Sequence, residues 1–173
     1  MARSGLIMNL FLDSLGLSFP LIPLQDPYDW MKRKEAKFSK QTYSETIYRL
    51  RRRGFLKVIE KNDNRFIEVT KKGQLETLLY KASLGRIVVW DGKWRILVFD
   101  IPESSREKRD QFRWLLKRNN FVKLQASVFV SPYALNKAAI RYLQESGLME
   151  FIRIMRVDKM DNDSDLRNKF NLK

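Results

Sequence analysis

The sequence predicts an α+β protein made of two small modules. Residues 94–157 alternate β-rich and helical patterns in the order strand, helix, strand, strand, helix, strand. Residues 39–80 instead predict a helix, a hairpin and a second helix. A length of 173 residues suits one domain of ordinary size or two small ones, and the two separate patterns favour two.

The first module begins with an expected helix from Ser39 to Gly54. Ser39 is suited to be its N-cap, and Gly54 is suited to end it in a left-handed conformation. Tyr43, Ile47 and Leu50 recur at helical spacing, so one face of this helix is apolar. The opposite face is polar and basic.

A hairpin and a second helix follow. Two β-rich runs, residues 55–59 and 65–69, flank the turn-forming residues 61–64. Thr70 then precedes a helical pattern that runs toward Tyr80. Helix, hairpin and helix together are the order typical of a winged helix-turn-helix.

The segment before the first helix is less regular. Pro20, Pro23 and Pro27 interrupt it. We expect residues 26–36 to form a shortened partner helix of the helix-turn-helix, with Asp26 as N-cap and Pro27 in the first turn.

The second module opens with a strand over residues 95–99. It ends before Pro102, because proline removes a hydrogen-bond donor from a strand. A helix begins near Glu103, and strands are expected at residues 121–124 and 127–130.

A second helix and a fourth strand complete this module. The helix is expected over residues 135–143, with Gly147 as its stop, and the strand over residues 151–157. The resulting order is that of the ferredoxin-like split βαβ fold.

The second module resembles a known family. A strand ending in FDIP, then Arg106 and Arg109, a helix and the block LQASVFVSP, resembles the central domain of PaaX-type transcriptional repressors. The pattern is similar, more distantly, to the CRISPR-associated Cas-two family, whose small ferredoxin-like subunits form dimers. The resemblance covers residues 91–157.

The first module resembles bacterial winged helix-turn-helix repressors. Residues 50–56 read L-x-R-x-G-F-L, and residues 69–73 read V-T-x-x-G. PaaX-type proteins carry such a domain before the ferredoxin-like one. We therefore expect a winged helix-turn-helix domain at 1–80, a linker at 81–92, a ferredoxin-like, Cas-two-like dimerisation domain at 93–157 and a C-terminal tail at 158–173.

The resemblance implies a transcriptional repressor that binds double-stranded DNA as a homodimer on a pseudo-palindromic operator. It also implies a ligand-responsive regulator, with an aryl-acyl-CoA as the effector of the founding group. PaaX-type proteins continue into a further C-terminal region, and we expect this chain, whose last residue is Lys173, to lack it.

Composition and charge narrow the classes of function. Without cysteine or histidine, the chain has no disulfide, no thiolate metal site and no histidine base, which excludes zinc enzymes and Ser-His-Asp hydrolases. The net charge is +14, and two segments carry most of it: residues 31–61 hold +8 and residues 93–157 hold +7. Clustered positive charge attracts phosphate backbones. No segment combines a basic face with the broad apolar face of a membrane-surface helix, so nucleic acid is favoured over a membrane.

The sequence predicts a cytoplasmic protein. Residues 5–12 are apolar but too short to span a bilayer, and only Arg3 precedes them. We expect a short buried helix or a dimer contact in this segment.

Candidate DNA-binding residues lie in the first module. In a helix-turn-helix, the first residues of the second helix meet base edges and the flanking cations meet phosphates. The expected base contacts are Lys40, Gln41, Ser44, Glu45 and Tyr48. The expected backbone contacts are Arg49, Arg51, Arg52, Arg53, Lys61 and Arg65. For residues 51–53 the alternative is a solvated helix end that complements the helix dipole.

Asp100 raises a second class of function. In the Cas-two family an aspartate at the tip of the first strand has been associated with nuclease activity, so that resemblance implies a Mg²⁺ site shared by two subunits. A non-catalytic nucleic-acid scaffold is a further alternative. Val130 stands where the CRISPR proteins commonly carry a glutamate, and PaaX-type repressors keep the aspartate. We therefore favour no catalytic residue and no cofactor, and expect Asp100 to cap the helix near Glu103 or to pair with Arg106 or Arg109.

Two groups of side chains in the second module have alternative roles. One group supplies a second DNA contact or only the solvated face of a helix: Arg106, Arg109, Arg113, Lys117 and Arg118. The other group suits a core or a dimer interface better than a base-stacking platform: Trp90, Trp94, Phe99, Trp114 and Phe129.

Overall fold

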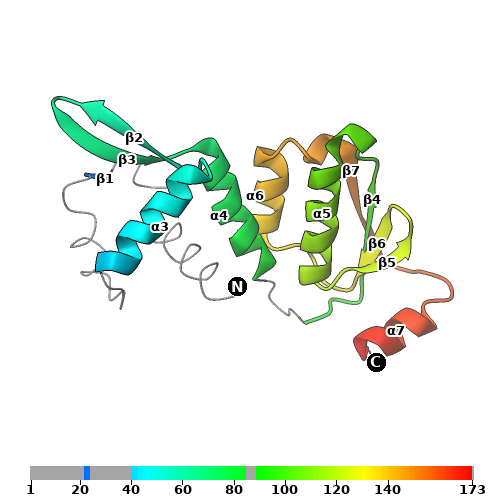
Figure 1. Cartoon of the computed structure of the whole chain (residues 1–173). Coiled ribbons are helices and arrows are strands. Elements are labelled where there is room, and N and C mark those ends of the chain that lie inside the picture. Colours follow the sequence, from blue (N-terminus) through cyan, green and yellow to red (C-terminus); the bar gives the residue numbers. More distant parts are fainter. Residues whose placement is uncertain (1–21, 24–39, 85–88, 173) are drawn as a thin grey trace. The chain divides into compact units, whose positions relative to one another are not determined.

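The structure, a computed structural model, describes residues 22–23, 40–84 and 89–172. The chain forms two compact units, Met1–Tyr80 and Lys81–Lys173, which we describe separately (Figure 1). The expected cap at Ser39 and the expected helices within residues 5–12 and 26–36 lie outside the described residues.

The first unit holds a helix, a hairpin and a second helix, as the sequence predicts. Their bounds are Lys40–Arg52 for α3, Leu56–Lys61 for β2, Asn64–Val69 for β3 and Lys71–Ser83 for α4. Residues 81–83 of α4 belong to the second unit. The hairpin turns at Asn62 and Asp63, with φ of 50° and 59°. A two-residue type I′ turn requires these left-handed conformations, which asparagine and aspartate tolerate.

A short strand from the N-terminal segment joins the hairpin. Strand β1 (Ile22–Pro23) pairs antiparallel with β3, with Ile22 opposite Ile67 and Pro23 opposite Phe66. The sheet order is β1-β3-β2, so β1 is an edge strand. The proline that predicts only a chain break is therefore compatible with pairing, because an edge strand tolerates a missing donor.

Gly54 ends α3, as predicted. Its φ is +73°, its N–H donates to Arg51 O at 2.9 Å, and the Phe55 N–H donates to Leu50 O at 2.9 Å. These two bonds form a Schellman motif, which satisfies the last carbonyl groups of a helix. The motif turns Phe55 inward, where its side chain is only 3% exposed.

Thr70 fastens α4 to the same turn. Its hydroxyl donates to Gly54 O at 2.6 Å and accepts from the Gly73 N–H at 3.2 Å, while its own N–H donates to Phe55 O at 2.9 Å. Gly73 lies directly against the same carbonyl, since a Cβ built there would stand 2.3 Å from Phe55 O. We call Gly54, Phe55, Thr70 and Gly73 the glycine–threonine joint.

The second unit is a four-stranded antiparallel sheet with α5 and α6 on one face (Figure 1). The bounds are Trp94–Phe99 for β4, Glu103–Ser105 for the 3₁₀ turn η1, Arg106–Arg118 for α5, Val122–Gln125 for β5, Val128–Ser131 for β6, Lys137–Glu145 for α6, Met149–Phe151 for η2 and Ile152–Val157 for β7. The order β5-β6-β4-β7 places β6 between the strands that α5 connects, and β4 between those that α6 connects. This topology confirms the predicted ferredoxin-like fold.

An aromatic cluster forms the centre of this unit. Phe99 of β4 packs edge-on against Phe112 of α5, with 5.2 Å between ring centroids, and lies 6.0 Å from Phe129 of β6. Leu115 and Leu116 of α5 are fully buried beside it. The helical spacing of these apolar residues is therefore the spacing of the buried face of α5.

Asparagine side chains organise the ends of α5 and α6. Asn136 caps α6, because its Oδ1 accepts the Ala139 N–H at 2.8 Å. Asn119, which is 5% exposed, donates its amide to Ala82 O and to Leu115 O, each at 2.9 Å. Asn136 donates to Ala82 O at 2.9 Å and to Asn119 Oδ1 at 3.1 Å, so these buried polar groups are mutually satisfied.

Residues 158–173, expected as a tail, contain the helix α7 (Ser164–Phe170). Asp163, just before it, accepts the Trp94 indole N–H at 2.9 Å and the Arg167 Nε–H at 2.9 Å. The Arg167 guanidinium also lies 4.9 Å from the ring centroid of Trp90. These contacts attach α7 to the start of β4.

We expect Gly73→Ala to destabilise the first unit by about 2–3 kcal/mol, because the added methyl group would overlap Phe55 O and force α4 away from it. Hydrogen exchange of amides in α3 and α4, compared with amides in β4 and β7, reports on each unit separately. Glu76→Ala, one turn further along α4, is the matched control and is expected to cost under about 0.5 kcal/mol. Unchanged protection in the Gly73 variant would show that the joint does not need a glycine.

A second prediction concerns the stability of the fold at low pH. Hydrogen bonds from Arg167 and then Trp94 lower the pKa of Asp163. A carboxyl whose pKa is lowered by folding stabilises the fold above its unfolded pKa, about 3.9, and loses that contribution as the pH falls through the folded pKa. The wild type is therefore expected to be more stable than Asp163→Asn at pH 7, and this difference should shrink below about pH 4. Thermal denaturation followed through tryptophan fluorescence measures the difference. A difference that stayed constant with pH would show that the charge on Asp163 does not hold α7.

Candidate nucleic-acid interface

Helix α3 presents one polar face to solvent. Gln41, Ser44, Glu45 and Tyr48 are exposed at three- and four-residue steps, and Tyr48 is 64% exposed despite its size. The opposite face buries Ile47 and Leu50, as predicted. The side chains of Lys40 and Tyr43 lie outside the described residues. The residues expected to contact bases therefore share one side of this helix, as far as the structure describes them.

Glu45 is held on this face by two neighbours. Gln41 Nε2 donates to its carboxylate at 3.3 Å, and Arg49 Nη2 donates to it at 3.2 Å, one turn away on either side. These contacts are exposed, and exposed ion pairs contribute little to stability. Gln41 and Arg49 can therefore exchange Glu45 for a nucleic-acid partner at small cost.

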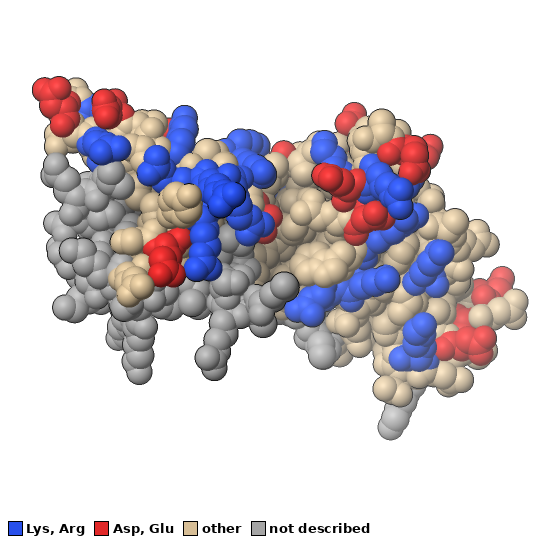
Figure 2. Space-filling view, viewed as in Figure 1, with Lys and Arg blue, Asp and Glu red and all other residues tan. Residues whose placement is uncertain are grey.

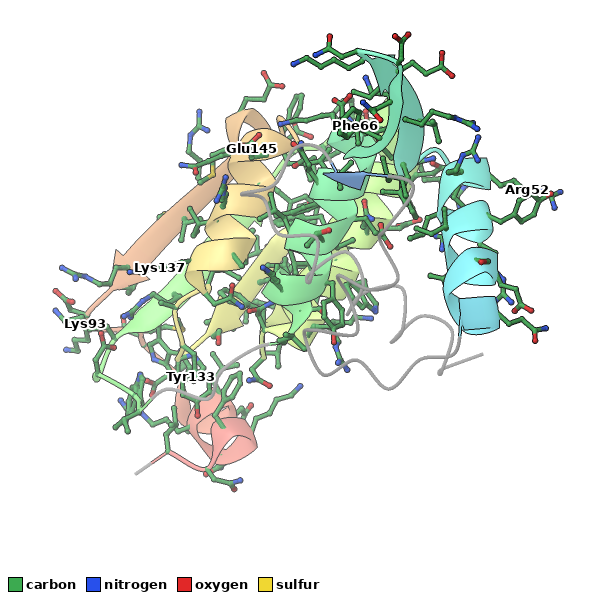
Figure 3. The ribbon with its side chains drawn as sticks, turned by 90° about the vertical axis from the view of Figure 1, so that its left-hand side faces the viewer. Arg52, Phe66, Lys93, Tyr133, Lys137 and Glu145 are labelled. Atoms are coloured by element: carbon green, nitrogen blue, oxygen red, sulfur yellow. The ribbon has the colours of Figure 1, made fainter. Side chains whose placement is uncertain are left out.

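Positive charge gathers at the C-terminal end of α3 (Figure 2). Arg51 and Arg52 are exposed and have no ion-pair partner among the described residues, and Arg52 points away from the helix into solvent (Figure 3). The Arg53 guanidinium instead lies 4.6 Å from the centroid of the Phe55 ring. Lys72 adds a further cation, whose amine donates to Arg53 O at 3.0 Å.

The hairpin carries its charges as cross-strand pairs. Lys57 lies 3.0 Å from Glu68, and Arg65 lies 3.8 Å from Glu60. Lys61, next to the turn, is exposed. Of the two wing residues expected at the DNA backbone, Lys61 is thus unpaired among the described residues and Arg65 has a loose acidic neighbour.

The structure adds a groove to these residues. The groove lies between α3 and β2, has a volume of about 490 Å³ and is open to solvent. We call it the α3–β2 groove, and its lining residues are Tyr48, Arg51, Arg52, Leu56, Lys57 and Val58. The sequence does not single out the three β2 residues, because the groove exists only once the joint has set α3 against the hairpin.

Asp100 does not make the contacts expected of it. Its N–H donates to Phe151 O at 3.0 Å, but its carboxylate is exposed and caps no helix, since Pro102 precedes η1. Arg109 pairs with Glu103 at 2.6 Å, and that hydrogen bond lowers the pKa of Glu103. The expectation of a cap or of a pair with Arg106 or Arg109 is therefore wrong.

Arg106 lies 3.9 Å from Asp110, away from Asp100. No group of three aspartate or glutamate side chains that could hold a metal ion occurs within residues 22–23, 40–84 and 89–172. Mg²⁺ usually binds through one or two carboxylates together with waters and substrate phosphates, so Asp100 would need those further ligands to hold it.

The other groups of the second unit divide between core and surface. Trp94, Phe99 and Phe129 are buried, Trp90 is half-buried, and Trp114 on α5 is 46% exposed. On the same helix Arg113 lies 3.5 Å from Asp110. Of the five cations of α5 considered as a second DNA contact, Lys117 and Arg118 are exposed and lack an ion-pair partner among the described residues.

Residues 88–168 match the family model described as PaaX protein central Cas2-like domain. The match includes every strand of the four-stranded sheet and both helices that cover it. A comparison with curated proteins gave no match. Among the described helices, none is long and apolar enough to cross a bilayer.

We expect the purified protein to leave supercoiled plasmid intact in the presence of Mg²⁺ or Mn²⁺, because Glu103, the carboxylate nearest to Asp100 along the chain, is paired with Arg109 at 2.6 Å. Gel electrophoresis of the plasmid after incubation measures this. Asp100→Ala and the exposed control Asp161→Ala should behave as the wild type does. Metal-dependent cutting by the wild type that is lost only in the Asp100 variant would reverse the conclusion.

Proposed function

We propose that this chain, whose residues 88–168 match the central Cas2-like domain of PaaX proteins, is a DNA-binding transcriptional regulator of the PaaX type that represses as a homodimer. The observation that carries the proposal is the exposed face of α3, which combines hydrogen-bonding side chains in its first half with Arg51 and Arg52 at its end, both without an ion-pair partner among the described residues. An exposed helix of this kind fits the major groove, where helices read base edges. In this proposal the protein binds DNA without a metal or an organic cofactor and acts in the cytoplasm.

The proposed roles follow the position of each side chain on the first unit. Residues of α3 that precede its last turn contact bases: Lys40, Gln41, Ser44, Glu45 and Tyr48. Cations at the helix end and on the hairpin contact phosphates: Arg49, Arg51, Arg52, Arg53, Lys61 and Arg65. Gln41 is suited to adenine, because a carboxamide can pair with the N6 and N7 positions together.

The second unit supports the proposed homodimer. In the sheet register Ile96 is opposite Met155 and Val98 is opposite Val128, and residues paired in this way share one face. Phe99, whose ring contacts α5, points to the other face. Apart from Arg153, which is opposite Val98, these residues give the face without α5 and α6 an apolar surface, and Met155 on it is 43% exposed. We propose that a second copy covers this face, so that two α3 helices read the two halves of a pseudo-palindromic operator.

We expect the protein to bind DNA from upstream of its own gene more tightly than random DNA of equal length at about 150 mM salt, since phosphate contacts alone give no sequence preference. Electrophoretic mobility shifts with both DNAs give the ratio of affinities, and sedimentation of the complex should give two chains per operator. Gln41→Ala is expected to lower the ratio about 5- to 150-fold, which corresponds to the roughly 1–3 kcal/mol of discrimination by a bidentate contact.

The matched control is Gln144→Ala, which removes an exposed glutamine from α6 and should leave the ratio unchanged. A wild-type ratio close to one would contradict sequence-specific regulation through this DNA.

A further inference from the structure

The α3–β2 groove has an apolar floor between charged walls. Leu56 is buried and Val58 is half-buried, and successive strand residues alternate in direction, so these two side chains form the floor together. Tyr48, Arg51 and Arg52 rise from α3 at one side. The groove is open to solvent, which differs from the enclosed pockets that bury most of a small ligand. Its apolar floor and charged sides suit a chain with alternating charged and uncharged groups.

The charges beside the groove favour an anion at its α3 side. Arg51 and Arg52 have no ion-pair partner among the described residues, whereas the Lys57 amine is engaged by Glu68 at 3.0 Å. The C-terminal end of a helix carries about half a negative charge, which two guanidinium groups outweigh. Glu45 lies toward the opposite end of the same face and repels phosphate from there. The favourable position for a phosphate is therefore beside the second half of α3.

Geometry brings a phosphate chain to this position when α3 lies in a major groove. A helix with its side chains is about 10–12 Å across, and the major groove of B-DNA is about 12 Å wide. The two sugar–phosphate backbones therefore run along the flanks of an inserted helix. The α3–β2 groove follows one flank of α3, between that helix and the strand that begins the hairpin.

We infer that the α3–β2 groove binds one strand of the DNA backbone, with Arg51 and Arg52 on consecutive phosphates and the Tyr48 ring packed on the intervening deoxyribose. This inference rests on the proposed DNA-binding function and gives Tyr48 a new role. Its ring lies with the backbone-binding residues of the groove and not with the base-reading residues. Leu56 and Val58 supply the apolar surface against which the sugar is placed.

The experiment measures DNA affinity as a function of salt for single variants of the full chain. Each phosphate contact adds about 0.9 to the slope of log affinity against log salt. We expect Arg51→Gln and Arg52→Gln each to reduce that slope by about 0.9, on operator and on random DNA alike. Tyr48→Ala should weaken binding to both DNAs by roughly three- to ten-fold with no change of the salt slope, since it removes an uncharged contact. The ratio between the two DNAs should stay constant in all three variants.

Lys137→Gln is the matched control, because it removes one exposed positive charge from α6 in the other unit. A slope reduced as much by Lys137→Gln as by Arg51→Gln would overturn the inference, since the effect would then be one of overall charge. If Tyr48→Ala weakened binding to the operator but not to random DNA, the inference would also be overturned, because Tyr48 would then contact bases. Both outcomes leave sequence-specific binding intact, and only a wild-type affinity ratio of one removes the proposed function itself. Circular dichroism checks that each variant is folded. We expect all three to fold, because Tyr48, Arg51 and Arg52 are exposed.

Discussion

The first unit depends on one hydrogen-bonded contact, the glycine–threonine joint. The Thr70 hydroxyl bonds to Gly54 O and to the Gly73 N–H, so one side chain satisfies the end of α3 and the start of α4 together. Helix ends otherwise leave such groups without intrahelical partners. Phe55 O accepts the Thr70 N–H, and Gly73 permits the approach because any side chain there would meet that carbonyl. The turn at Gly54 and Phe55 and the start of α4 at Thr70 and Gly73, which are separate in the sequence, are thus the two sides of one contact.

The joint explains how an exposed helix can have a fixed position. Only two described side chains of α3, Ile47 and Leu50, are buried, which is a small apolar area for a helix of 13 residues. The joint adds a directional constraint at the helix end, just where the chain turns into β2. It therefore sets the width of the α3–β2 groove and the angle at which α3 presents Gln41 and Arg52. A rigid support of this kind is what preorganised recognition requires.

Much of the fold could be predicted from the sequence because its signals are local. Apolar periodicity predicts α5, and Gly54 and Gly147 mark helix ends that adopt φ of +73° in both cases. The end of α5 is made by Asn120 at φ of 60°, a position where glycine is commoner, so its signal is weaker. The groove, the attachment of α7 through Asp163 and the partner of Arg109 depend on contacts between distant segments. Spacing along the chain carries no information on such contacts, so the neighbours that the sequence predicts for Asp100 are wrong.

Asp100 illustrates why a shared fold does not fix the chemistry. At the tip of β4 its N–H bonds to Phe151 O, and the Phe99 N–H bonds to Ser127 O, so the backbone there closes the sheet on both sides. The nearest carboxylate along the chain, Glu103, is neutralised by Arg109. A metal ion at this tip would have to compete with that guanidinium for its second ligand. The FDIP segment therefore ends the second strand from one edge of the sheet, and in the proposed function recognition belongs to side chains of α3.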